Sequence, residues 1–289
     1  MRKTVLNQVG LMMLFFVIPF TSFAQIGPNG FNPNSVRGEQ RTIYGQPIYE
    51  ADVMYRTSVW RKINLREKQN KPFFAIENEI TRVIMDGVEE GKLQPYNYDA
   101  SPRTDGFKDP MTKEEFRGHM KYWDANFGDS INIRPGDLYL IELKEDLIFD
   151  RRRSRMYWDI QSITLVIPQG TNEETELGDF RIATFKWKDL YKYFKESYDE
   201  SQKKGTFEQV RAHWYNPENP RRHMSLADAF ELRLFSSRIT KISNPDDKDI
   251  VTIINDEYGD DPDAGRKILY MSQKIEYDLV EYEHNLWEF

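Results

Sequence analysis

The side chains best suited to catalysis or metal binding are few and scattered in this chain. Its four histidines are His119, His213, His223 and His284, and no two of them stand four residues apart, as a zinc site on one helix requires. The chain has no cysteine, which excludes thiol catalysis, and it contains neither a G-x-S-x-G turn nor a phosphate-binding glycine motif. The sequence therefore predicts no catalytic residue, cofactor or metal. A triad assembled from distant serine, histidine and aspartate residues stays open as an alternative.

One cluster of arginines could bind a partner rather than a substrate. Arg151, Arg152, Arg153 and Arg155 concentrate positive charge in a short polar segment. Guanidinium groups hold carboxylates through paired hydrogen bonds, so this segment is a candidate interface for an acidic surface. A solvated turn without any binding role explains the same residues equally well.

An acidic cluster lies near the C-terminus, around Gly259 and Pro262, and comprises Asp256, Glu257, Asp260, Asp261 and Asp263. Oxygen-rich loops can bind calcium, but these residues lack the spacing of an EF-hand loop. An acidic surface turn is the favoured interpretation.

The arginine cluster needs strands to position it. Residues 138–149 and 155–167 are rich in β-formers and flank the polar segment, which predicts a β-hairpin with the arginines at its turn. Residues 180–185 indicate a further strand, whereas residues 52–65 fit the start of either a helix or a strand. Together with the helices below, these strands predict an α+β fold built on an antiparallel sheet.

Several segments have helical spacing. The first ends at the capping glycine Gly91 and contains Ile76, Ile80, Val83, Ile84 and Val88. The second begins at a capping box of Thr112 and Glu115 and continues through Phe116, Met120 and Trp123. A third follows Leu190, Phe194 and Tyr198. A fourth begins at Ser225 and presents Leu226, Phe230 and Leu234 on one stripe.

The C-terminal helix has the most regular apolar spacing. Steps of four and three residues connect Ile268, Ser272, Ile275, Leu279, Tyr282 and Leu286. Such a narrow seam most often packs on its own domain, and less often on a neighbouring subunit. Its second half is a candidate interface, consisting of Ile275, Leu279, Tyr282, Leu286 and Trp287.

The N-terminus has the features of an export signal. Arg2 and Lys3 precede a short apolar run, and small residues at Ser22 and Ala24 mark a cleavage site between Ala24 and Gln25. The run is shorter than the roughly 20 residues that a membrane-spanning helix needs. Residues 1–24 are therefore predicted to be a signal peptide, with a buried N-terminal helix as the alternative.

The expected mature chain is acidic and begins with an arm. Removing residues 1–24 takes away two of the 40 basic residues and leaves 38 against 47 acidic ones, a net charge of −9. Such a charge disfavours nucleic-acid binding. Residues 25–46 are rich in Gly, Pro, Asn and Ser, which predicts a flexible arm. Residues 47–289 are then predicted to form a single domain without disulfides.

Several blocks of sequence resemble one known family. Residues 47–55 read P-I-Y-E-A-D-V-M-Y, and residues 59–68 read V-W-R-K-I-N-L-R-E-K. Further blocks are S-L-A-D-A-F-E at 225–231, F-S-S at 235–237 and L-V-E-Y-E-H-N-L-W-E-F at 279–289. In this order and spacing they are similar to the gliding-motility protein N family (GldN/PorN) of the type IX secretion system.

Two positions depart from the family pattern. Tyr55 and Leu226 stand where tryptophan is common in the family. Both replacements keep an apolar side chain, so the resemblance covers nearly the whole chain after residue 46.

The resemblance implies a structural role rather than a reaction. It implies a periplasmic subunit that forms a ring with an outer-membrane lipoprotein of the GldK/PorK type. The subunit would also contact the periplasmic part of a motor protein of the GldM/PorM type, and would reach the membranes only through partners. Two alternatives stay open: an exported hydrolase or glycan-binding enzyme with a dispersed active site, and a substrate of the secretion system. The helical C-terminus argues against the second, since such cargo ends in a β-sandwich domain.

Overall fold

The computed structural model describes residues 48–98, 107–124, 129–170, 178–203, 211–219, 221–259 and 261–286. The predicted signal peptide with its Ala24–Gln25 junction, the predicted arm at 25–46 and the candidate interface residue Trp287 lie outside the described residues.

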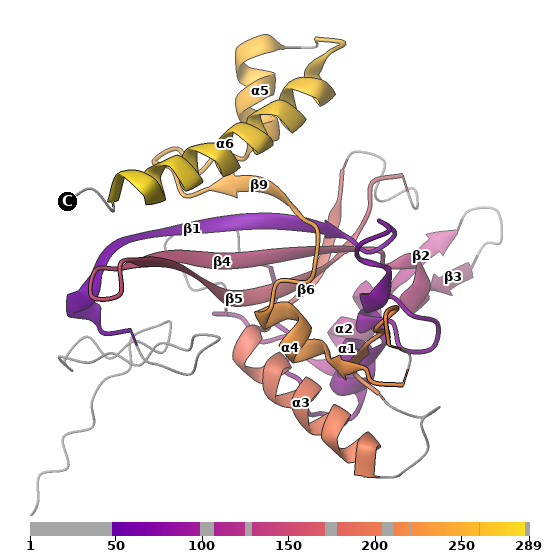
Figure 1. Cartoon of the computed structure of the whole chain (residues 1–289). Coiled ribbons are helices and arrows are strands. Elements are labelled where there is room, and N and C mark those ends of the chain that lie inside the picture. The colour runs from indigo at the N-terminus through magenta and orange to yellow at the C-terminus, as the bar shows by residue number, and fades with distance from the viewer. Residues whose placement is uncertain are drawn as a thin grey trace, which may run out of the picture.

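A five-stranded antiparallel sheet forms the centre of the fold, with strand order β6-β5-β4-β1-β9 (Figure 1). The strands are β1 Val53–Asn64, β4 Leu140–Asp150, β5 Arg155–Ile167, β6 Phe180–Lys186 and β9 Arg238–Ile242. The predicted hairpin and the strand after it are confirmed as β4, β5 and β6. The ambiguous block at 52–65 is a strand, preceded by a single 3-10 turn at Glu50–Asp52.

Helices and short strand pairs make up the rest of the described chain. The helices are α1 Ile80–Glu89, α2 Lys113–His119, α3 Trp187–Lys203, α4 Leu226–Glu231, α5 Ile250–Tyr258 and α6 Ala264–Leu286. The short strands are β2 Lys121–Asp124, β3 Asp129–Asn132, β7 His213–Trp214 and β8 Met224–Ser225, and single 3-10 turns cover Lys71–Phe73 and Pro135–Asp137. The predicted α+β class is confirmed.

Helix boundaries follow the capping residues seen in the sequence. The Thr112 hydroxyl accepts a hydrogen bond from the Glu115 amide, and the Glu115 carboxylate accepts one from the Thr112 amide, which completes the capping box of α2. The Ser225 hydroxyl caps α4 by accepting from the Ala227 amide. Gly91 follows the end of α1 with a φ of 71°, a left-handed conformation that glycine adopts without steric cost.

Three predicted helical segments are longer than the helices that form. Ile76 lies before α1 and is 90% exposed, because the chain turns through a left-handed residue at Glu77 before the helix begins. Trp123 lies on β2 rather than α2, because the backbone of residues 121–124 pairs with β3. Leu234 follows α4, since Arg233 adopts a positive φ of 54° and ends the helix there.

Two apolar clusters share one face of the sheet. Along β1, alternation places Val59, Arg61 and Ile63 on the same side, because successive residues of a strand point to opposite faces. Ile63 belongs to a large cluster with α1–α4, whereas Val59 belongs to a small cluster with α5 and α6. The sheet twists, so the two groups of helices meet it from different directions in Figure 1.

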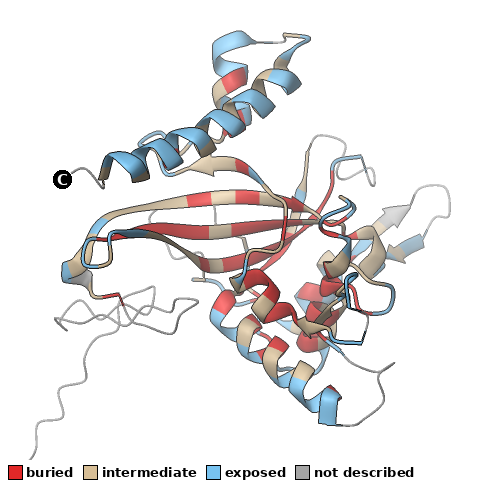
Figure 2. Ribbon diagram, viewed as in Figure 1, coloured by how far each residue is buried: buried red, intermediate tan, exposed pale blue. Residues whose placement is uncertain are grey.

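Burial follows this arrangement. Figure 2 shows β4 and the second half of β5 buried along most of their length, while β1 and β9 are largely intermediate and the outer sides of α3, α5 and α6 are exposed. Among the described residues, no helix has the length and apolar character needed to cross a lipid bilayer.

Candidate interaction sites

The histidines do not converge on one site. His213 and His223, on the short β7–β8 pair, stack with ring centroids 4.6 Å apart. Nδ1 of His223 accepts a hydrogen bond from the Asn216 amide at 3.0 Å, and burial lowers the pKa of His223. His119 lies against the Ile182 carbonyl, and His284 is exposed on α6. Within the described part of the chain, no three histidine or acidic side chains are grouped to hold a metal ion.

The four arginines lie at the β4–β5 turn, as the hairpin prediction required. The buried Asp150 carboxylate organises this turn: it accepts hydrogen bonds from the Arg152 amide at 2.9 Å and from Arg153 Nη1 at 2.8 Å. The Arg152 guanidinium also lies 5.2 Å from the centre of the Tyr49 ring. Arg151 and Arg155 are exposed. The turn therefore uses part of its positive charge internally and presents the rest to solvent.

The C-terminal seam packs on its own sheet. Ser272 and Leu279 are buried, and Ile268 and Ile275 contact the small apolar cluster. A partner could therefore reach Ile275 or Leu279 only if α6 moved off the sheet.

The last turns of α6 lie beside the arginine turn. Tyr282 packs on Tyr55 with ring centroids 4.7 Å apart, yet it remains 40% exposed. Leu286 is half-buried. In Figure 1 this end of α6 points toward the β4–β5 turn. The arginine turn and the end of the seam thus form one neighbouring surface, although 127 residues separate Met156 from Glu283, whose carboxylate accepts from the Met156 amide.

A buried network of charged side chains lies between the two apolar clusters. Glu145 on β4 is fully buried and pairs with Arg61, whose Nε lies 3.0 Å from the carboxylate, and with Arg233. Arg61 Nη1 also donates to Glu276 on α6 at 2.6 Å. Both guanidinium groups stack on Trp158, at 4.5 and 5.0 Å from its ring centre. The network connects the strands, the segment after α4 and the C-terminal helix.

The network also brings the family-like sequence blocks together. Arg61 comes from the V-W-R block and lies 3.5 Å from the Ser237 hydroxyl of the F-S-S block. Ser236 of the same block exchanges two hydrogen bonds with Asn70, which follows the first blocks. Leu279, the first residue of the closing block, packs one helical turn from Glu276. Residues that are distant in sequence thus meet at this buried charged network.

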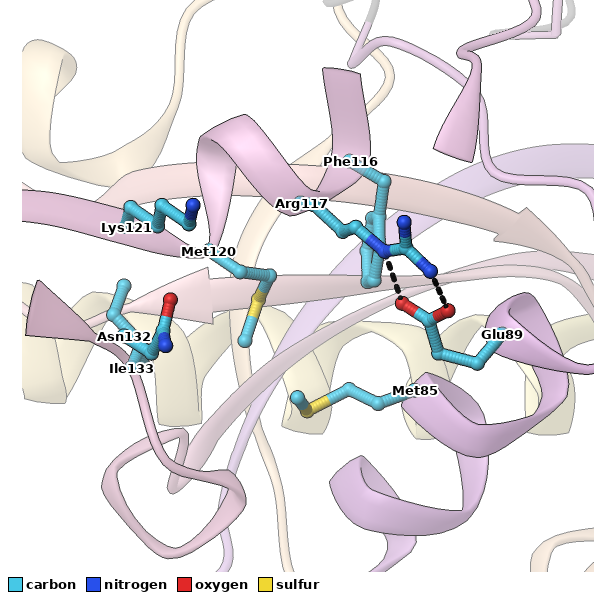
Figure 3. Close-up of a pocket in the computed structure, with 8 residues that line it drawn as sticks. All are labelled: Met85, Glu89, Phe116, Arg117, Met120, Lys121, Asn132 and Ile133. Carbon is cyan, nitrogen blue, oxygen red and sulfur yellow. Dashed lines mark hydrogen bonds and ion pairs between the residues drawn. The ribbon is translucent and has the colours of Figure 1, made fainter. Parts of the chain in front are cut away.

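A surface pocket of about 330 Å³ opens between the end of α1, α2 and the β2–β3 pair (Figure 3). Met85, Phe116, Met120 and Ile133 form its apolar part. At its edge Arg117 forms a two-pronged ion pair with Glu89, with Nε 2.7 Å from Oε1, and this contact lowers the pKa of Glu89. The pocket is suited to an apolar side chain beside a charged group.

The described residues of the acidic cluster lie at the surface, at the end of α5 and in the turn before α6, as predicted. Asp256 pairs with Lys248, Asp261 with Lys267, and Asp263 with Arg266. Because each of these three carboxylates has a basic partner nearby in the sequence, their charge is already balanced locally.

The buried network and the surface pocket were not predicted. The available sequence signal for the buried network was an arginine, Arg61, in an otherwise apolar strand face between Val59 and Ile63. The sequence held no signal for the surface pocket, because the residues that line it come from four separate elements.

Comparison with known proteins settles the family. No curated protein matches the chain. A family model described as gliding motility associated protein GldN matches residues 48–288, a span that contains every described residue. The match includes the sequence blocks noted above, apart from Pro47 and Phe289, and the buried network at Arg61. The chain therefore belongs to the GldN family, a family of gliding-motility and type IX secretion components.

Proposed function

We propose that this chain is a non-enzymatic structural subunit of the type IX secretion and gliding machinery in the periplasm. It forms a ring with an outer-membrane lipoprotein of the GldK/PorK type and contacts the motor protein of the GldM/PorM type. The observation that carries this proposal is the family match over residues 48–288. A ring subunit needs two different surfaces that repeat around an axis, and it needs no reactive group.

The contacts are proposed at the end of the molecule where the arginine turn and the end of α6 meet. Arg151, Arg152 and Arg155 supply positive charge there, and Arg153 holds the turn in shape through Asp150. Tyr282 and Leu286 supply apolar area, and Trp287, which follows them in the chain, stays a candidate from the sequence alone. Mixed surfaces of this kind, with arginine and aromatic side chains, are enriched at protein interfaces. Ile275 and Leu279 act indirectly, by holding α6 against the sheet.

The test is a pull-down of the tagged chain from cross-linked envelopes, with quantitative mass spectrometry of the retained proteins. We expect one outer-membrane lipoprotein in near-equal amount and a smaller amount of a motor protein. Recovery of the chain alone and as a monomer would overturn the proposal and would return attention to an exported enzyme.

Charge-reversal variants distinguish a specific role of the arginine turn in partner binding from an effect of the chain's net charge. The triple variant R151E/R152E/R155E should lose most of the lipoprotein or the motor protein from the pull-down. The matched control reverses the exposed Lys188 and Lys192 on α3, K188E/K192E, and should retain both partners. Equal losses in the two variants would show that net charge, rather than this turn, governs recovery.

A further inference from the structure

Helix α6 has a second seam on the side away from the sheet. Steps of four and three residues connect Arg266, Tyr270, Gln273, Tyr277, Val280 and His284. This is the same spacing as the inner seam, shifted round the helix. A helix with two such seams can pack on two surfaces at once.

The outer seam is exposed and partly apolar. Tyr270 is 68% exposed, Tyr277 70% and Val280 55%. Figure 2 shows this outer side of α6 as a nearly continuous exposed surface. The neighbouring Leu269 is also exposed, at 38%. Large apolar side chains gathered on one helix face mark a contact with another molecule more often than scattered ones do.

The charges of α6 are separated along its length. Its first half, residues 264–275, contains Arg266, Lys267 and Lys274 and no acidic residue. Its second half, residues 276–286, contains Glu276, Asp278, Glu281 and Glu283 and no lysine or arginine. This order opposes the helix dipole, which favours acidic side chains at the N-terminus and basic ones at the C-terminus. Stability of the isolated helix therefore does not explain it.

Some of these charges are used within the chain. Arg266 and Lys267 pair with Asp263 and Asp261, and Glu276 pairs with Arg61. The exposed Lys274, Asp278 and Glu281 form no ion pair within the described residues. They lie on the outer side, next to the Tyr277 position, with the positive charge on one side of Tyr277 and the negative charges on the other.

We propose that the outer seam binds the same seam of a second copy of this chain, with the two α6 helices antiparallel. A two-fold axis near Tyr277 then places Lys274 of each copy opposite Glu281 of the other. Tyr270 of each copy packs toward His284 of the other. A segment whose charge changes sign about its centre is complementary to itself only in the antiparallel orientation.

This contact goes beyond the proposed ring. It is a two-fold contact, in which both copies use the same residues, whereas neighbours in a ring use two different surfaces. It also involves the outer side of α6, not the arginine turn. It can therefore be tested on the purified chain without any partner protein.

Charge exchange is the first test. Sedimentation equilibrium of the purified chain should show a monomer–dimer equilibrium. K274E and E281K should each weaken dimerisation about tenfold, because each reverses both symmetric ion pairs. The double variant K274E/E281K should restore it, since the pairs are then exchanged. All these side chains are exposed, so folding is unaffected; circular dichroism checks this.

A cysteine cross-link locates the two-fold axis. The chain has no native cysteine, so Y277C can form a disulfide only with a second copy. Mild oxidation should give a covalent dimer with Y277C and little with the control K192C, on the exposed side of α3.

Three outcomes would overturn the proposal. The first is equal cross-linking of Y277C and K192C. The second is the absence of rescue in the double variant K274E/E281K. The third is a chain that stays monomeric at all concentrations while K274E loses a protein partner from the envelope pull-down. That result would assign the outer seam to a helix of the partner. The arginine-turn variant R151E/R152E/R155E should dimerise normally, so failure of the ring proposal and failure of this one are distinguishable.

Discussion

The half of the sheet covered by α1–α4 and the half covered by α5 and α6 differ greatly in apolar burial. Among the described residues, 32 buried side chains form the first cluster and six form the second. Full burial of a large apolar side chain contributes roughly 1.5–3 kcal/mol. The α1–α4 half therefore holds most of the apolar stabilisation. The α5–α6 half depends on a few contacts and on the charged network at Arg61.

This difference predicts that the two halves of the sheet differ in their local stability against unfolding. Regions with few buried contacts open locally before the whole protein unfolds. Opening of α6 would expose Ile275 and Leu279 without disturbing the large cluster. The residues of the family-like blocks that lie at the Arg61 network then have a physical role, because they fix the position of the weakly packed helix α6.

The largest effect is expected in the large cluster. Phe230→Ala removes a ring that contacts Phe73, Trp187 and Phe235, and should lower the free energy of unfolding by about 4 kcal/mol. Urea denaturation followed by circular dichroism measures it. The control Leu232→Ala, 53% exposed just beyond the same helix, should change stability by less than about 0.5 kcal/mol. Similar losses in both would contradict the assigned core.

The second-largest effect is expected in the buried charged network at Arg61 and Glu145. Glu145→Leu removes the buried carboxylate shared by Arg61 and Arg233 and leaves Arg61 paired only with the partly exposed Glu276. It should cost about 3 kcal/mol, since buried positive charge that loses its carboxylate partner is strongly unfavourable. The double variant Arg61→Met with Glu145→Leu should recover part of this loss, because no uncompensated guanidinium remains at that position. Equal stability of the single and double variants would show that the pairing is unimportant.

A smaller and more local effect is expected in the α5–α6 half. Leu279→Ala should cost about 2 kcal/mol, at the low end for a buried leucine, because the site lies near the surface. Amide hydrogen exchange should accelerate in α6 and β9 but not in α1 or α3. The control Val251→Ala, 44% exposed on α5, should leave the exchange of α6 and β9 unchanged. Acceleration throughout the protein would show that the halves unfold together.

The smallest effects are expected from removing two helix N-caps, one in each half of the molecule. The Thr112 hydroxyl caps α2, and the Asp249 carboxylate caps α5 by accepting from the Thr252 amide at 2.8 Å. Thr112→Ala and Asp249→Ala should each cost about 1 kcal/mol. Thr112→Ala should lower global stability in urea. Asp249→Ala should mainly accelerate exchange in α5. Global losses of equal size from both would argue against independent opening of the small half.

Local patterns predicted most of the elements. The β4–β5 hairpin, the capped starts of α2 and α4, and the long C-terminal helix all follow from neighbouring residues, and all are confirmed. The errors are at helix ends. Ile76 and Trp123 have helical spacing, but backbone turns and strand pairing decide their conformation, and neither depends on side-chain spacing alone. The expected use of the arginine turn and the seam as interfaces remains a prediction.

The sequence by itself determined the class of fold, the family and the regular seam of α6, because these depend on local spacing and on ordered blocks of residues. Only the tertiary structure decided that Arg61, Glu145, Arg233 and Glu276 meet in one buried network. It also decided that the inner seam is occupied while the outer one is exposed. The physical reason is that burial and ion pairing depend on which distant strands and helices become neighbours, and sheet register and twist fix those neighbours.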